Sequence, residues 1–170
     1  MKAFLVSIPS SKSRNILHDA SAVGHLIEEA DSRPVSQLAL DDAWAPLHFT
    51  LTGEYPIPRQ KAEELGLEWH EGTLEDAIMG GLPTRYGSSY GPARFLAPPD
   101  VSLVAEKLAG VSLDALRARF DPQALEVEQI LPQGWEAGST LKIVEDCFLK
   151  LREFYLHAAA KGDAILIYFV

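Results

Sequence analysis

A tryptophan and a histidine stand four residues apart in this sequence, at Trp44 and His48. A helix would place both side chains on one face, and Asp41 could reach the same face one turn earlier. A histidine beside a carboxylate can act as a general base or respond to pH near neutrality. The alternative is a semi-buried His48 that bonds a backbone carbonyl, with Trp44 in the core, because buried polar groups usually find such partners.

Residues 79–92 form a second group with chemical potential, because they are rich in Gly, Ser and Tyr. Backbone amides around Gly80 and Gly81 could approach an anion, and Arg85 or Arg94 could supply positive charge. The alternative is an irregular surface loop in which the glycines satisfy turn geometry. Long irregular loops are enriched in function, so we treat this stretch as a candidate site.

Two tyrosines of this stretch, Tyr86 and Tyr90, could stack on a planar ligand. Together with His48 and Arg94 they would then surround a cleft. Such a cleft requires that side chains far apart in the sequence converge on one concave, partly apolar pocket.

Other candidates for chemistry are weaker. His18 and His25 could hold a metal with Glu28 or Glu29. However, residues seven apart on a helix lie about 10 Å apart, so solvated side chains are the better interpretation. Cys147 is expected to be a small packed residue, since no basic neighbours would activate it.

The usual catalytic signatures are absent from the sequence. There is no phosphate loop, no dinucleotide fingerprint and no nucleophile elbow. No cysteine pair and no His-Glu-x-x-His motif offers a metal site. We therefore expect neither a cofactor nor a metal, and an enzyme is the less favoured class.

The chain has 170 residues, which fits one domain spanning residues 1–170, and 47% of them are hydrophobic, enough for a sizeable core. The formal charge is −9, from 24 acidic and 15 basic residues. This excess argues against binding to nucleic acid or to an anionic membrane. It is compatible with small molecules or with a basic protein partner, although an acidic surface can also simply maintain solubility. No pattern specifies an oligomeric state.

A cytoplasmic location is the expectation from the apolar segments. The single cysteine allows no internal disulfide, and the first apolar run ends at Pro9, too short for a signal peptide. No run approaches the roughly 20 apolar residues that span a bilayer.

The two ends of the chain predict strands of one sheet. Residues 3–8 are nearly continuous and apolar, and residues 164–170 are fully apolar, which is typical of a central strand covered on both faces. Between residues 139 and 161, apolar residues recur every three or four positions and predict a long helix ended by Gly162. The predicted fold is a helix-rich, layered α/β sandwich with α+β character, in which helices cover a small sheet.

The remaining elements follow from shorter patterns. Ile16 to Ala30 predicts a helix, and a second helix starts or breaks near Ala45 because Pro46 suits only a first turn. The other expectations are a loop with one short helix over 52–72, a capping box at 73–76, an irregular stretch over 79–92, a strand at 93–97, helices after Pro98, Ser112 and Asp121, and a loop over 131–139 pinned by Trp135.

Four segments in order resemble a known family. They are 40–53, with an acid, Trp44, a Leu-His pair and a closing Leu-Thr-Gly; 76–81, which ends in two glycines; 90–101, which leads from a strand into a helix; and the final helix with its terminal strand. Together they cover nearly the whole chain and are similar to the bacterial YfbM-like family.

The resemblance implies a three-layer α/β sandwich in a cytoplasmic bacterial protein, and it implies no established activity. Pro46 departs from the family pattern, and the glycine-rich stretch at 82–90 is variable in type.

Two hypotheses of function follow. The first is a binding module whose acidic surface, or whose 79–94 loop, contacts a partner such as a basic toxin or effector. The second is an enzyme or small-ligand binder with His48, Arg94 and the glycine loop around a cleft. The absence of catalytic motifs favours the first.

Overall fold

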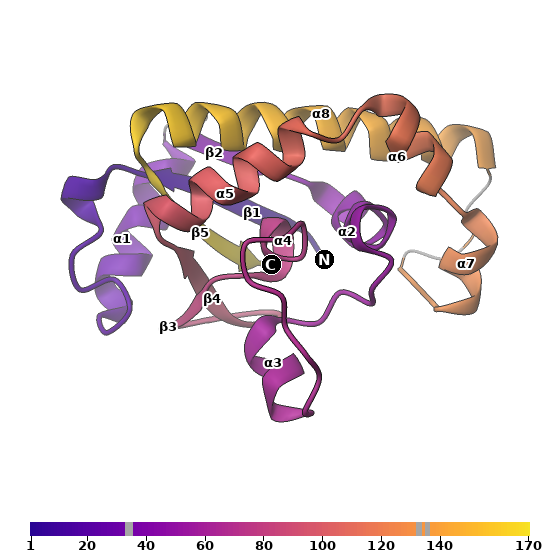
Figure 1. Ribbon diagram of the computed structural model, residues 1–170. Helices are drawn as coiled ribbons and strands as arrows, with labels where there is room; N and C mark the ends of the chain where they lie inside the picture. The colour runs from indigo at the N-terminus through magenta and orange to yellow at the C-terminus, as the bar shows by residue number, and fades with distance from the viewer. Residues whose placement is uncertain (33–35, 132–133, 135–136) are drawn as a thin grey trace.

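A five-stranded antiparallel sheet forms the centre of the computed structural model (Figure 1). The structure describes residues 1–32, 36–131, 134 and 137–170, without the side chains of 137–139. The predicted loop around Trp135 therefore lies outside the described residues. The strands are β1 (Ala3–Ile8), β2 (Gln37–Ala39), β3 (Leu82–Ser88), β4 (Gly91–Leu96) and β5 (Ala164–Phe169), in the order β2-β1-β5-β4-β3.

The terminal strand β5 is the middle strand of this sheet, as its apolar sequence predicted. It pairs with β1 through Leu5 opposite Ile167, and with β4 through Arg94 opposite the same Ile167. All of its residues are buried. The two apolar chain ends therefore share one sheet, and a layered α/β fold is confirmed.

Alternate side chains of β5 point to opposite faces of the sheet. Helices cover both faces, so β5 contributes to two cores. Ile165 and Ile167 face a large core built with α2 (Trp44–Thr52), α4 (Asp76–Met79), α5 (Pro98–Ala109) and the long α8 (Ala137–Lys161). Leu166 and Tyr168 face a smaller core closed by α1 (Ala20–Asp31). Figure 1 shows α8 and α5 running along one side of the sheet and α1 at its end. The other helices that lie wholly within the described residues are η1 (Ser10–Lys12), η3 (Asp41–Ala43), α3 (Arg59–Glu64), α6 (Leu113–Arg119) and α7 (Pro122–Val127).

The irregular loop predicted over 79–92 is wrong, because these residues form most of the β3–β4 hairpin. Gly91 closes the turn with φ 85°, and the pairing register shifts between Pro83 and Gly87. Proline and glycine are tolerated here because β3 is an edge strand. An edge strand with no apolar alternation leaves no period-2 signal, so the sequence pattern did not indicate it.

The first helix begins later than its apolar pattern predicted. The Asp19 side chain accepts hydrogen bonds from the backbone N–H groups of Ser21 and Ala22, so α1 starts at Ala20. Ile16 precedes the helix but is still buried. The pattern therefore identified the buried face correctly and misplaced the boundary.

Several capping predictions are confirmed. Pro46 lies in the first turn of α2, and the Ser112 and Asp121 side chains cap α6 and α7. The predicted short helix within 52–72 is α3. Over the described part of the chain, no helix has the length and apolar character needed to cross a bilayer.

Candidate functional site

Helix α2 places Trp44 and His48 inside the protein. The Trp44 indole Nε1–H donates to the Met1 carbonyl at 3.1 Å, and only 2% of His48 is exposed. Asp41 does not join them, because α2 starts at Trp44 and Asp41 lies in the preceding 3₁₀ turn with φ 38°. Its carboxylate binds the Lys2 ammonium at 2.9 Å instead. The expected histidine–carboxylate pair is therefore not formed.

Arg94 is a buried arginine on β4, only 1% exposed. Its Nε–H donates to the Gly80 carbonyl at 3.1 Å, and its Nη2 donates to the Ile78 carbonyl at 2.8 Å. The guanidinium carbon also lies 5.3 Å from the centre of the Phe169 ring, within cation–π range. Arg94 thus satisfies carbonyls at the end of α4, and the glycine pair presents it with a carbonyl acceptor rather than amides for an anion.

The glycine pair is required by close packing between α4 and the hairpin. A Cβ at Gly80 would overlap the backbone and the carboxylate of Asp76. A Cβ at Gly81, where φ is 91°, would lie 3.0 Å from the Phe95 carbonyl carbon and oxygen. These positions admit only glycine, which lets the chain pass from α4 into β3 directly against β4.

Burial and mutual charge keep His48 uncharged. Burial, together with the smaller effect of the positive charge of Arg94, lowers the pKa of His48 to about 3. Burial also lowers the pKa of Arg94 to about 10, while Tyr155 and Tyr90 act in the opposite direction. His48 Nδ1 and Arg94 Nη1 have no hydrogen-bond partner within the described residues. The two side chains are thus close enough for the charge of Arg94 to act on His48, and both lie in the interior.

The two tyrosines of the candidate site lie on opposite faces of the sheet. Tyr90 packs against Trp44 and Phe169, with ring centres 5.7 and 5.6 Å away, and its hydroxyl donates to the Pro56 carbonyl at 3.0 Å. Tyr86 packs with the smaller core, next to Gly24 of α1. They form no common stacking platform.

Neither a metal site nor an activated thiol is formed by the other candidates. His25 Nδ1 lies 3.7 Å from a Glu28 oxygen, and both side chains are largely exposed. No group of three or more potential metal-ligating side chains occurs among the residues that the structure describes. Cys147 is half-buried, and burial raises the pKa of its thiol.

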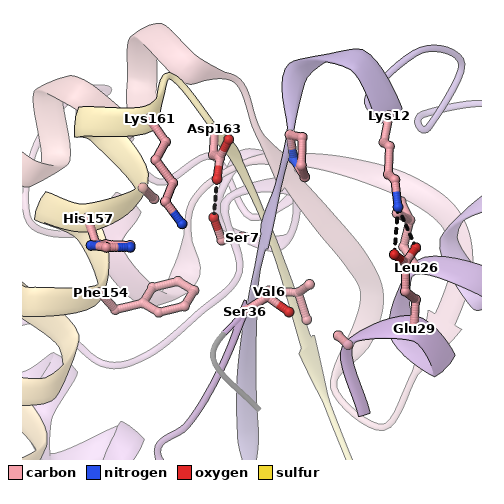
Figure 2. A pocket seen from close by; sticks show the side chains of 13 residues that line it. Val6, Ser7, Lys12, Leu26, Glu29, Ser36, Phe154, His157, Lys161 and Asp163 are labelled. Atoms are coloured by element: carbon pink, nitrogen blue, oxygen red, sulfur yellow. Dashed lines mark hydrogen bonds and ion pairs between the residues drawn. The ribbon is translucent and has the colours of Figure 1, made fainter. Parts of the chain in front are cut away.

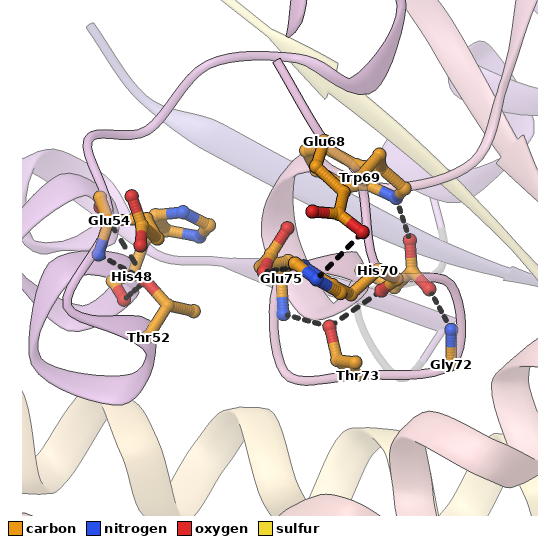
Figure 3. Close-up of polar contacts among 10 residues, drawn as sticks. His48, Thr52, Glu54, Glu68, Trp69, His70, Gly72, Thr73 and Glu75 are labelled. Carbon is orange, nitrogen blue, oxygen red and sulfur yellow. Dashed lines mark hydrogen bonds and ion pairs between the residues drawn. The ribbon is translucent and has the colours of Figure 1, made fainter. Parts of the chain in front are cut away.

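A buried carboxylate that sequence reasoning missed fixes the loop before α4. Asp76 accepts hydrogen bonds from the Trp69 indole at 3.2 Å and from the Gly72 backbone N–H at 2.6 Å. Figure 3 labels the two donors, Trp69 and Gly72. The pKa of Asp76 is raised above its usual value, because the effect of burial is larger than the opposing effect of these two hydrogen bonds. The Thr73–Asp76 pattern predicts a capping box, but Asp76 accepts from Trp69 and Gly72, which precede Thr73, and the Thr73 hydroxyl accepts from the Glu75 backbone N–H.

The acidity of the chain is concentrated in residues 54–76, which we call the acidic segment. It holds seven acidic and two basic residues, a net charge of −5 within a chain of net charge −9. Both basic residues are already paired: Arg59 with Glu63 and Glu71, and Lys61 with Glu64. Figure 1 shows its helix α3 projecting from the body of the molecule.

An apolar groove lies beside this negative charge. It has a volume of about 460 Å³ and runs between α3 and the turn that joins β3 to β4. Leu65 lies on its edge and is 57% exposed, and Tyr55 and Leu67 of the same segment are 47% and 50% exposed. The full lining consists of Ile57, Pro58, Gln60, Lys61, Glu64, Leu65, Ser89, Tyr90, Gly91 and Pro92.

Comparisons with known proteins agree with this fold. The family model described as "Domain of unknown function (DUF1877)" matches residues 1–168. The chain belongs to this family. The crystal structure of YfbM from Escherichia coli, described as a protein of unknown function, superposes with a TM-score of 0.64 at 19% identity, covering 98% of each chain. No curated protein matches.

Membership of the DUF1877 family confirms the kinship that the four sequence segments indicated. At 19% identity the similarity to YfbM establishes the shared fold. Neither description states an activity, so a function must be argued from the surface and the cavities of this chain.

Proposed function

We propose that this protein is an interaction module that binds a basic protein partner through the acidic segment and its apolar groove. The observation that carries the proposal is a groove of about 460 Å³ beside the acidic segment, whose exposed part at 54–71 has five acidic and two basic residues. A negative rim attracts and orients a positive partner, and apolar pockets supply most of the binding free energy.

The chemistry of the segment favours a basic partner. The side chains of Glu64, Glu68 and Glu71 are 53%, 86% and 69% exposed, so solvent-accessible partner lysines and arginines could compete with their contacts to Lys61, His70 and Arg59. The exposed Leu65 and Leu67, which lie between Glu64 and Glu68 in the sequence, offer apolar contacts. The matching partner is therefore a basic amphipathic segment with one or two large apolar side chains.

The alternative of a ligand cleft at His48 and Arg94 has less support. Both side chains are almost completely buried, at 2% and 1% exposure, and His48 is uncharged at neutral pH. The Arg94 guanidinium carbon also lies 5.3 Å from the centre of the Phe169 ring, which packs against Trp44 and Tyr90.

The double variant Glu64→Lys/Glu68→Lys tests the proposal by affinity capture from a native lysate. The wild-type protein should retain a basic partner that is released by rising salt. The variant should bind the purified partner at least ~10-fold more weakly, because like charges then face one another. Isothermal titration calorimetry of the purified pair gives the dissociation constants.

The matched control is Glu106→Lys/Glu153→Lys, which changes the net charge equally at exposed positions on α5 and α8. The control should bind like the wild type. Equal weakening in both variants would mean that only the overall charge matters, and capture of no basic partner would contradict the proposal. Retention of a second copy of this chain alone would replace it with self-association.

A further inference from the structure

A second cavity lies far from the acidic segment, between β1, α1 and the last turns of α8 (Figure 2). Its volume is about 210 Å³, which is several times the roughly 30 Å³ that a water molecule occupies in the liquid. Drug-sized ligands and cofactors usually occupy pockets of about 300 Å³ or more. The cavity therefore suits a small metabolite and is too small for a nucleotide.

A nearly buried carboxylate stands at one side of this cavity. Asp163 follows the end of α8, is 8% exposed, and accepts a hydrogen bond from the Ser7 hydroxyl at 2.7 Å. No lysine, arginine or histidine pairs with it within the described residues. A carboxylate that is buried from water and accepts from only one neutral donor is stabilised when a cation binds it.

Two basic side chains line the wall of the same cavity. His157 and Lys161 lie one turn apart on α8, and in Figure 2 both reach toward the side of the pocket that holds Asp163. Neither forms an ion pair in the part of the chain that is described. Lys12, by contrast, is held across the cavity by both oxygens of Glu29, at 2.6 and 2.7 Å. The α8 wall thus offers an anion the Lys161 ammonium and, beside it, the His157 imidazole as a hydrogen-bonding group.

Apart from Ser36, the rest of the lining is apolar. Phe154 lies one turn before His157 on the same wall, and Val6 and Leu26 contribute from β1 and α1 (Figure 2). Apolar walls with a few convergent polar groups are typical of small-molecule sites.

We propose that this cavity binds a small zwitterion, namely a free amino acid with an apolar side chain. Its ammonium group binds Asp163 and Ser7, its carboxylate binds Lys161 and His157, and its side chain packs on Phe154. The opposite charges on the cavity wall match the two ends of such a molecule, and the volume matches its size. This site lies apart from the acidic segment and does not depend on the proposed partner.

Calorimetric titration with five apolar amino acids tests the site: valine, leucine, isoleucine, methionine and phenylalanine. At least one should bind with a dissociation constant below ~1 mM. For the best of them, the matching amine without the carboxylate and the matching acid without the amine should each bind at least ~10-fold more weakly. For leucine these compounds are 3-methylbutylamine and 4-methylpentanoate. No binding of any of the five at ~10 mM, or equal binding of the single-charge compounds, would overturn the proposal.

Two substitutions locate the binding. Lys161→Met removes an exposed ammonium and should weaken binding at least ~10-fold, while Lys150→Met, on α8 but outside the cavity lining, should leave it unchanged. Asp163→Asn should weaken binding similarly, and its circular dichroism spectrum checks that the fold is kept. Unchanged affinity in Lys161→Met and in a folded Asp163→Asn would place the binding elsewhere and refute the assignment.

Discussion

Replacing Arg94 with methionine should lower the free energy of unfolding by about 2–4 kcal/mol. The guanidinium satisfies the carbonyls of Ile78 and Gly80, and both acceptors lose their partner in the variant. A buried carbonyl without a donor costs about 1–3 kcal/mol, and relief from burying the arginine charge offsets part of that cost. Urea unfolding followed by circular dichroism measures the change.

Two further variants make the Arg94 experiment specific. Arg94→Lys keeps the charge but loses the planar fork that reaches two carbonyls, so it should also be destabilised. Arg85→Met on the neighbouring strand removes an exposed arginine and should change stability by less than about 0.5 kcal/mol. If Arg94→Met were as stable as the wild type, Arg94 would not stabilise the junction between α4 and β3.

The pH dependence of stability should contain a large contribution from His48. Its pKa is about 3 in the folded protein, below the value of about 6.5 in the unfolded chain. Above pH 6.5 both states are neutral and the contribution is complete. As the pH falls from 6.5 toward 3, only the unfolded state gains the proton, so stability is lost by up to about 1.4 kcal/mol per pH unit.

In the variant His48→Met, the free energy of unfolding should fall less between pH 7 and pH 4 than in the wild type, by up to about 3 kcal/mol. His25→Asn removes an exposed histidine and serves as the control, with no expected change in slope. Urea unfolding at several pH values gives the slopes, and the imidazole NMR signals of His48 should remain those of the neutral ring at pH 5. Titration of His48 near pH 6.5 in the folded protein would contradict the burial and the role of Arg94.

The elements that the sequence predicted well are those with strong local patterns. The apolar ends of the chain paired as expected, and the periodic stretch before Gly162 became α8. Prolines and capping side chains identified the starts of α2, α6 and α7. These features depend on residues near one another in the chain, so one sequence is enough to find them.

The elements that were missed depend on partners far away in the chain. Strand β3 is half-exposed and gains its structure from β4, so its own residues show no alternation. Strand β2 has only three residues and exists through its pairing with β1. Tertiary context of this kind overrides local preference.

The sequence does not show how deeply the residues of the candidate site lie. The spacing of Trp44, His48 and Arg94 in the sequence does not indicate how far each side chain is from solvent. In the structure all three are buried, so they lie in the interior and do not line an open cleft. The partners of Arg94 are backbone carbonyls, which every residue carries, so no side-chain pattern could have indicated them. The acidic segment was visible only as scattered charges until α3 was seen to project beside an apolar groove.

Hydrogen exchange measured on the complex with the captured basic partner tests the central claim most directly. If the acidic segment is the binding surface, amides of residues 54–72 and of the turn at 89–92 should exchange more slowly in the complex than in the free protein. The outer face of α8 should exchange at the same rate in both. Protection confined to α8 or α7, with 54–72 unchanged, would contradict the proposed interaction surface.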